Sequence, residues 1–172
     1  MTPENKNKLL QLLRQHKEIG ISNQIDYDKF YLYSIITHST AIEGSTVTEV
    51  EAQLLFDEGI TAKGKPMKEQ LMNLDLKNAY EYGRAWIKRH EAMTVDTLVT
   101  LASKVMARTG TEYNALGGSF DASKGELRRL NVTAGVGGRS YMNWIKVPQK
   151  LEAFCQECPP KCTRPDRYCS HL

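Results

Sequence analysis

The chain has 172 residues, 41% of them hydrophobic and 25% charged, and a formal net charge of +3. This length and composition are typical of a globular domain with a real core and exclude a disordered or fibrous protein. The small net charge gives no argument for a nucleic-acid or anionic-membrane surface, where clustered Lys and Arg would be expected, so we predict neither partner. No segment reaches the roughly 18 apolar residues of a membrane span, and residues 1–20 lack the apolar core of a signal peptide, so we expect a cytoplasmic location.

The first two helices are predicted from their start and stop signals. Residues 2–4, Thr-Pro-Glu, supply a cap hydroxyl, a proline at the first helical position and an acid in the first turn, which predicts a helix within residues 1–24. The apolar side of this helix is formed by Leu9, Leu10, Leu12 and Leu13. A second helix is predicted over residues 27–42, with Gly44 as its stop.

Three more helices are predicted before any strong strand signal. Thr48 and Glu51 form a capping box, and the helix that they start runs to Gly59. Longer helices follow over about residues 67–90 and 94–108. The side of residues 67–90 predicted to pack into the core carries Leu71, Leu74, Asn78, Tyr82 and Trp86 at three- and four-residue spacing.

The character of the sequence changes between residues 110 and 148, where paired glycines break the helical period. Short strands are predicted over about residues 128–132 and 139–146, forming a hairpin or an irregular flap that buries Trp144. The glycines indicate turns and not a phosphate-binding loop, because no Gly-Lys-Ser/Thr follows them. A last helix is predicted from Pro148 to about Glu157.

The segment of greatest functional interest is residues 39–44, Ser-Thr-Ala-Ile-Glu-Gly. Ser39 and Glu43 stand four residues apart and therefore share one face of the second helix. A carboxylate at the C-terminal end of a helix faces the negative end of the macrodipole, so Glu43 needs another reason to be there, such as a cationic partner. The alternative is a solvated terminal glutamate.

Two segments resemble motifs of the Fic family. Residues 39–44 are similar to its inhibitory-helix pattern, [S/T]-x-x-x-E-[G/N], in the form where that helix is N-terminal. Residues 125–132, Gly-Glu-Leu-Arg-Arg-Leu-Asn-Val, resemble the family segment G-x-[YFL]-R-x-x-N-V, which precedes a hairpin called the flap. The two matches come in the family's order, and the resemblance covers about residues 25–158. It implies a mainly α fold, namely the N-terminal portion of the Fic-type helical fold with a β-hairpin flap.

The resemblance also implies roles for particular residues. Fic proteins transfer AMP from ATP to a hydroxyl of a target protein, and ATP and Mg²⁺ are expected for the intact family enzyme. Residues 27–43 would be the inhibitory helix, with Ser39, Glu43 and Gly44 as the autoinhibitory residues. The flap, about residues 128–146, would dock a target protein by strand addition. The residues that the resemblance assigns to docking are Arg128, Asn131, Arg139 and Tyr141.

The family's catalytic loop, H-P-F-x-[DE]-G-N-G-R, is missing from this sequence, because none of the four histidines is followed by Pro-Phe. We therefore predict no catalytic residue in this chain, no AMP transfer by it and no cofactor bound to it alone. The resemblance implies a truncated N-terminal part of the enzyme. Exposed inner helix faces would then favour self-association.

Other interpretations remain open. The chain could inhibit a separate Fic partner in trans by presenting Glu43. The Cys- and Pro-rich residues 159–172 could be an out-of-frame tail unlike the family sequence. They could also complete a zinc-binding interaction module, since thiolates are favoured zinc ligands. The ligands of that module would be Cys155, Cys158, Cys162 and Cys169.

Overall fold

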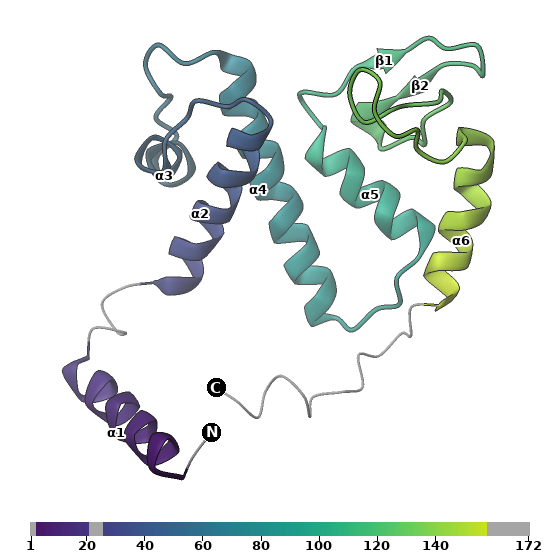
Figure 1. Ribbon diagram of the computed structural model, residues 1–172. Helices are drawn as coiled ribbons and strands as arrows, with labels where there is room; N and C mark the ends of the chain where they lie inside the picture. Colours follow the sequence, from purple (N-terminus) through teal and green to yellow (C-terminus); the bar gives the residue numbers. More distant parts are fainter. Residues whose placement is uncertain (1–2, 21–25, 158–172) are drawn as a thin grey trace.

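The computed structural model describes residues 3–20 and 26–157 and is mainly helical, as predicted (Figure 1). The helices are α1 (Pro3–Ile19), α2 (Tyr27–Ile42), α3 (Glu49–Glu58), α4 (Met67–Lys88), α5 (Val95–Val105) and α6 (Val147–Glu157). Two short strands, β1 (Glu112–Tyr113) and β2 (Phe120–Asp121), pair antiparallel, and two 3-10 turns are η2 (Ala122–Lys124) and η3 (Trp144–Lys146). None of the described helices has the length and apolar character needed to cross a membrane.

The helix ends follow the local signals in the sequence. The predicted range of α2 is confirmed, and Asp26 caps its start by accepting a hydrogen bond from the Lys29 amide at 3.0 Å. The predicted capping box is also confirmed: the Thr48 hydroxyl accepts from the Glu51 amide, and the Glu51 carboxylate accepts from the Thr48 amide at 2.8 Å. These contacts satisfy amide groups that have no partner inside a helix.

Helix α4 is the centre of the fold, with α2 on one side and α5 on the other (Figure 1). Its burial pattern corrects the predicted stripe, because Asn78 is exposed and only part of the stripe is shielded. The fully covered α4 side chains are instead Gln70, Asn73, Asp75 and Ala79. Because α4 is covered by a neighbouring helix on two sides, a single stripe of residues does not predict which of its side chains are buried.

Buried polar contacts join α4 to both neighbours. Asp75 is completely buried, and its carboxylate accepts the Arg108 backbone N–H at 2.7 Å and the Arg108 guanidinium at 3.0 Å. On the other side, the buried Asn73 amide oxygen accepts the Thr40 hydroxyl at 3.0 Å. Buried polar groups are costly unless paired, so these bonds specify how α2 and the end of α5 lie on α4.

The strands predicted over residues 128–132 and 139–146 do not form. The segment is an irregular hairpin with one β-bridge, Thr133 with Ser140, and Trp144 is half-buried at the start of η3. Glycines at 135, 137 and 138 shorten the pairing, since two of them have φ near +70° and none carries a side chain to pack. The regular pair, β1 with β2, lies earlier in the chain, in a segment where no strand was predicted.

Candidate functional site

The C-terminal end of α2 has a tightly specified backbone. The Ser45 amide donates to the Thr40 carbonyl and the Gly44 amide donates to the Ala41 carbonyl, both at 3.0 Å. These two bonds, with Gly44 at φ +92°, make a Schellman motif that ends the helix. Glycine is favoured at this position because of its backbone conformation, and Glu43 consequently occupies the C-cap.

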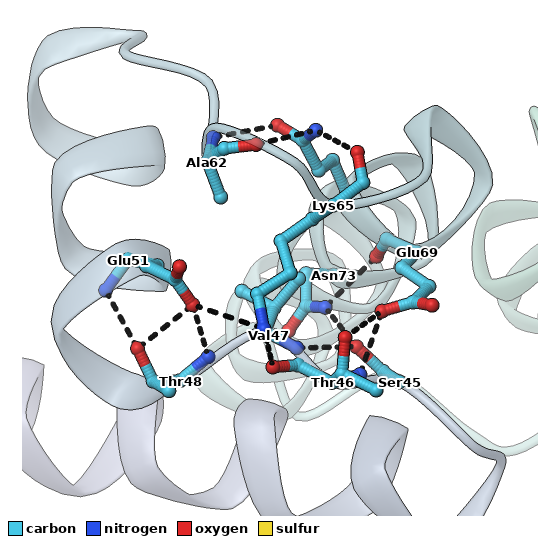
Figure 2. A network of polar contacts seen from close by, with 10 residues as sticks. Ser45, Thr46, Val47, Thr48, Glu51, Ala62, Lys65, Glu69 and Asn73 are labelled. Atoms are coloured by element: carbon cyan, nitrogen blue, oxygen red, sulfur yellow. Dashed lines mark hydrogen bonds and ion pairs between the residues drawn. The ribbon is translucent and has the colours of Figure 1, made fainter.

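A polar network fastens the segment after α2 to the start of α4 (Figure 2). The Asn73 amide nitrogen donates to the Ser45 hydroxyl at 3.2 Å and to the Glu69 carbonyl at 2.9 Å. The Glu69 carboxylate accepts from the Thr46 amide at 2.6 Å and from the Thr46 hydroxyl at 2.8 Å. Residues 45 and 46 are thus hydrogen-bonded to two side chains of α4. These bonds fix where the backbone of the nearby Glu43 lies.

The Lys65 side chain extends this network (Figure 2), and the Gln70 side chain ties the preceding loop to α4. The Lys65 ammonium donates to the Thr46 carbonyl at 2.8 Å. Gln70, which is buried, accepts from the Ala62 amide at 2.9 Å and donates to the Lys65 carbonyl at 3.1 Å. The loop before α4 is therefore tied to the same helix turn that holds the end of α2.

This network predicts that the fold loses stability in acid. The hydrogen bond from the Thr46 amide, followed by that from its hydroxyl, holds the pKa of Glu69 below its usual value of 4.5. A lowered folded-state pKa means that the unfolded chain binds more protons, so this contribution is complete well above pH 4.5 and is lost as pH falls through the folded-state pKa. Urea unfolding between pH 7 and pH 3 should show this fall, and Glu69→Gln should make it shallower. If the free energy of unfolding depends on pH equally steeply in Glu69→Gln and in the unaltered chain, Glu69 is not the group responsible. The control is Glu58→Gln, because the Glu58 carboxylate is exposed.

Ser39 and Glu43 line the same cavity, as their spacing predicted. The cavity has a volume of about 600 Å³ and lies between the end of α2, the first half of α4 and the segment that runs from α5 to β1. Its wall combines apolar side chains with hydroxyls and two oppositely charged groups. The lining residues are Ser39, Thr40, Glu43, Lys68, Met72, Leu76, Val105, Met106, Thr109, Thr111 and Tyr113.

The Glu43 side chain is exposed at this cavity. Within residues 3–20 and 26–157 its carboxylate makes no hydrogen bond or ion pair, although it stands at the negative end of the α2 macrodipole. A cation placed in the cavity would therefore find a carboxylate that no described residue pairs with.

The four residues assigned to the flap divide into two pairs. The Arg128 guanidinium donates to the Leu130 carbonyl at 2.6 Å and also to the Met142 carbonyl, and the Asn131 side-chain oxygen accepts from the Trp144 amide at 3.2 Å. Arg128 and Asn131 therefore hold the two arms of the irregular hairpin together. Sequence reasoning had assigned them to target docking and did not anticipate this internal role.

Arg139 and Tyr141 lie beyond that clamp, toward the tip of the hairpin. Both side chains are exposed, and both line a shallow hollow of about 370 Å³ over residues 134–142. Their backbones take part in the hairpin: the Ala134 amide donates to the Arg139 carbonyl and the Tyr141 amide to the Val132 carbonyl, each at 3.0 Å. This pair is accessible to a docking segment.

Sequence reasoning missed Asn73 and Glu69, which hold the α2 end in place. The signal that could have found them is a glutamate and an amide at i and i+4 on one helix, combined with the hydroxyl-rich residues 45–48 that need donors and acceptors. Periodicity alone drew attention to Asn78, which is exposed.

The proposed metal ligands fall mostly outside the described residues. Cys155 is half-buried on α6 with a free thiol, and Cys158, Cys162 and Cys169 lie beyond residue 157, so the zinc module stays a prediction. In the part of the chain that the structure describes, no three His, Cys, Asp or Glu side chains come together as metal ligands.

Comparison with models of known protein families finds no match, and comparison with curated protein sequences finds none either. The resemblance to Fic proteins thus rests on the two short segments and on what their residues can do.

Proposed function

We propose that this chain is the N-terminal part of a cytoplasmic Fic-type protein adenylyltransferase and that Glu43 is its autoinhibitory glutamate. The observation that carries the proposal is the Glu43 carboxylate, which is unpaired among the described residues and stands at a cavity of about 600 Å³ on a helix end held by a Schellman motif and by Asn73. Ser39 shares the cavity, and Gly44 supplies the turn. The three defined positions of the inhibitory pattern therefore lie together at this site.

The inhibitory action would be electrostatic. In the intact enzyme an arginine of the catalytic loop would hold the γ-phosphate of ATP, and a carboxylate beside that arginine pairs with it and repels the phosphate. Because the backbone after Glu43 is fastened to α4, the helix end would stay in place while the Glu43 side chain turns to make that pair. Arg139 and Tyr141 at the hairpin tip would receive the target segment.

The chain alone should transfer no AMP, because AMP transfer needs a base within reach of the target hydroxyl and a metal ion beside the phosphates. Neither the family's histidine nor its metal-binding acid is present in the sequence. Incubating the purified chain with labelled ATP and candidate protein targets checks this. Label on any protein above a blank without the chain would contradict the proposal.

Substituting Glu43→Gly should release AMP transfer in a product that also carries the catalytic loop. The DNA beyond the codon for Leu172, translated in all three frames, shows whether H-P-F-x-[DE]-G-N-G-R is encoded there. We expect a rise of about tenfold or more in label transfer, since a hydrogen bond to a charged group contributes roughly 1.5–3 kcal/mol. Glu58→Gly, an exposed glutamate at the end of α3, is the matched control. Equal activity of Glu43→Gly and the unaltered enzyme would refute the assignment.

A second function is favoured by the exposure of Glu43. A carboxylate that is accessible at a cavity mouth and unpaired in the described residues could enter the active site of a separate Fic enzyme and inhibit it in trans. Adding the chain to such an enzyme would then lower its AMP transfer, and Glu43→Gly would not. A coding region without the catalytic loop after Leu172 would favour this function over the first.

A further inference from the structure

Helix α1 carries a largely apolar stripe that no other described residue covers. Figure 1 shows α1 apart from the other helices, and its described side chains, residues 4–19, are exposed. Leu9, Leu12, His16 and Ile19 follow one another at spacings of three, four and three residues, which places them on one side of the helix. Leu12 is 53% exposed and Ile19 is 63% exposed. The opposite side carries polar groups such as Gln11.

Helix α2 has a matching stripe on the side that faces away from α4. Tyr31, Ile35 and Ile42 are its apolar members, and Ile42 is 84% exposed. The polar His38 lies between Ile35 and Ile42 at the edge of this stripe, where its Nδ1 is 3.3 Å from the Glu49 carboxylate of α3. The buried residues of α2, which include Ile36 and Thr40, lie on its other side. A soluble helix normally buries its apolar residues on one side. The additional apolar stripe on the outer side of α2 therefore indicates that another element packs there.

We propose that α1 folds back onto this outer stripe of α2 and that the two form an antiparallel helical hairpin. Residues 20–26 connect the helices, and seven residues span up to about 25 Å, which is ample for a turn between antiparallel neighbours. Leu9 then lies beside Ile42, and Ile19 lies beside Tyr31. The two stripes have nearly equal length, because Leu9 and Ile19 are ten positions apart on α1 and Tyr31 and Ile42 are eleven positions apart on α2.

The charges favour the antiparallel direction. Lys6 and Lys8 of α1 come to lie near the C-terminal end of α2, where the macrodipole is negative. Lys17, in the last turn of α1, comes to lie near Asp28, in the first turn of α2. A parallel arrangement would bring Glu4 of α1 toward Asp28, which is a repulsive contact.

The occupant is the chain's own α1 and not a second copy. A short tether gives α1 an effective concentration in the millimolar range at α2, well above the protein concentration in dilute solution. A seam of 17 residues is also shorter than the three to four heptads that a stable two-chain coiled coil needs. The hairpin is independent of the proposed enzyme function, since it uses the outer side of α2 and not the cavity side.

Amide hydrogen exchange of the full chain, followed by mass spectrometry, tests the hairpin. In the unaltered chain the α1 amides should be protected to the same extent at low and at high protein concentration. Leu12→Asp and Ile35→Asp should each lower that protection about tenfold or more, because each removes a buried aliphatic side chain from the seam. Gln11→Asp, on the polar side of α1, should leave the protection unchanged.

Three results would overturn the hairpin. The first is α1 amides that exchange at unprotected rates in the unaltered chain. The second is equal protection of the α1 amides in Leu12→Asp and Gln11→Asp. Because Leu12 lies outside the core, this comparison remains valid even if Ile35→Asp unfolds the protein. The third is protection that increases with protein concentration together with a dimer in sedimentation, which would assign the stripe to a second copy.

Discussion

Replacing Gly125 with alanine should lower the free energy of unfolding by about 3 kcal/mol or more. Gly125 ends η2 with φ +71°, where an L-residue costs roughly 1–2 kcal/mol. A Cβ there would also lie 2.1 Å from the Val99 carbonyl oxygen and 2.8 Å from the Ser103 amide nitrogen, both in the backbone of α5. Backbone in the middle of a helix cannot move aside without breaking its hydrogen bonds, so overpacking adds a further 1–3 kcal/mol, roughly. The shift of the urea unfolding midpoint measures the loss.

Gly64→Ala is the matched control for this prediction. Gly64 has φ +77°, close to that of Gly125, and a Cβ at residue 64 would have no atom within 4 Å. It should therefore lose only the conformational part, roughly 1–2 kcal/mol. Equal losses in the two variants would mean that the close approach of Gly125 to α5 has no energetic weight. The result bears on function as well, because Gly125 is the first residue of the segment that resembles the Fic flap motif.

Replacing Asp75 with alanine should have the second largest effect, about 2–3 kcal/mol in the free energy of unfolding. The Asp75 carboxylate is fully buried and accepts two bonds from Arg108, one from the backbone and one from the guanidinium. Its removal leaves the partly buried Arg108 N–H without an acceptor and leaves a small void beside α4. The Arg108 side chain is 47% exposed and can turn to water, which limits the loss. Urea unfolding at pH 7 measures it.

The ion pair between Asp28 and Arg84 is the control for Asp75. Its shortest distance, 2.9 Å, is close to the 3.0 Å of the buried pair, but the Asp28 side chain is 83% exposed. Exposed pairs contribute roughly 0–1 kcal/mol, so Asp28→Ala should change stability little. A loss in Asp28→Ala as large as that in Asp75→Ala would show that burial does not decide the energy of these pairs.

Part of this molecule follows from the sequence alone, because the decisive interactions lie within one or two helix turns. The range of α2, its stop at Gly44 and the Thr48–Glu51 capping box all depend on residues at most five positions apart, and all were predicted correctly. The shared face of Ser39 and Glu43 is likewise a consequence of helical spacing, and both side chains do line one cavity.

Only the tertiary structure decided which polar side chains are buried and what each motif residue does. Thr40 meets Asn73, and Asp75 meets Arg108, across 33 positions in each case, so no local pattern reports these pairs. Arg128 joins the two arms of the hairpin because its partner, the Met142 carbonyl, lies 14 positions further along the chain.

The strands predicted in the flap do not form, and this too depends on residues far apart in the sequence. Strand pairing depends on the partner segment, and here the glycines near the tip and the start of η3 leave room for a single bridge. Local preferences thus specified the helices, while long-range packing specified the cavity beside Glu43.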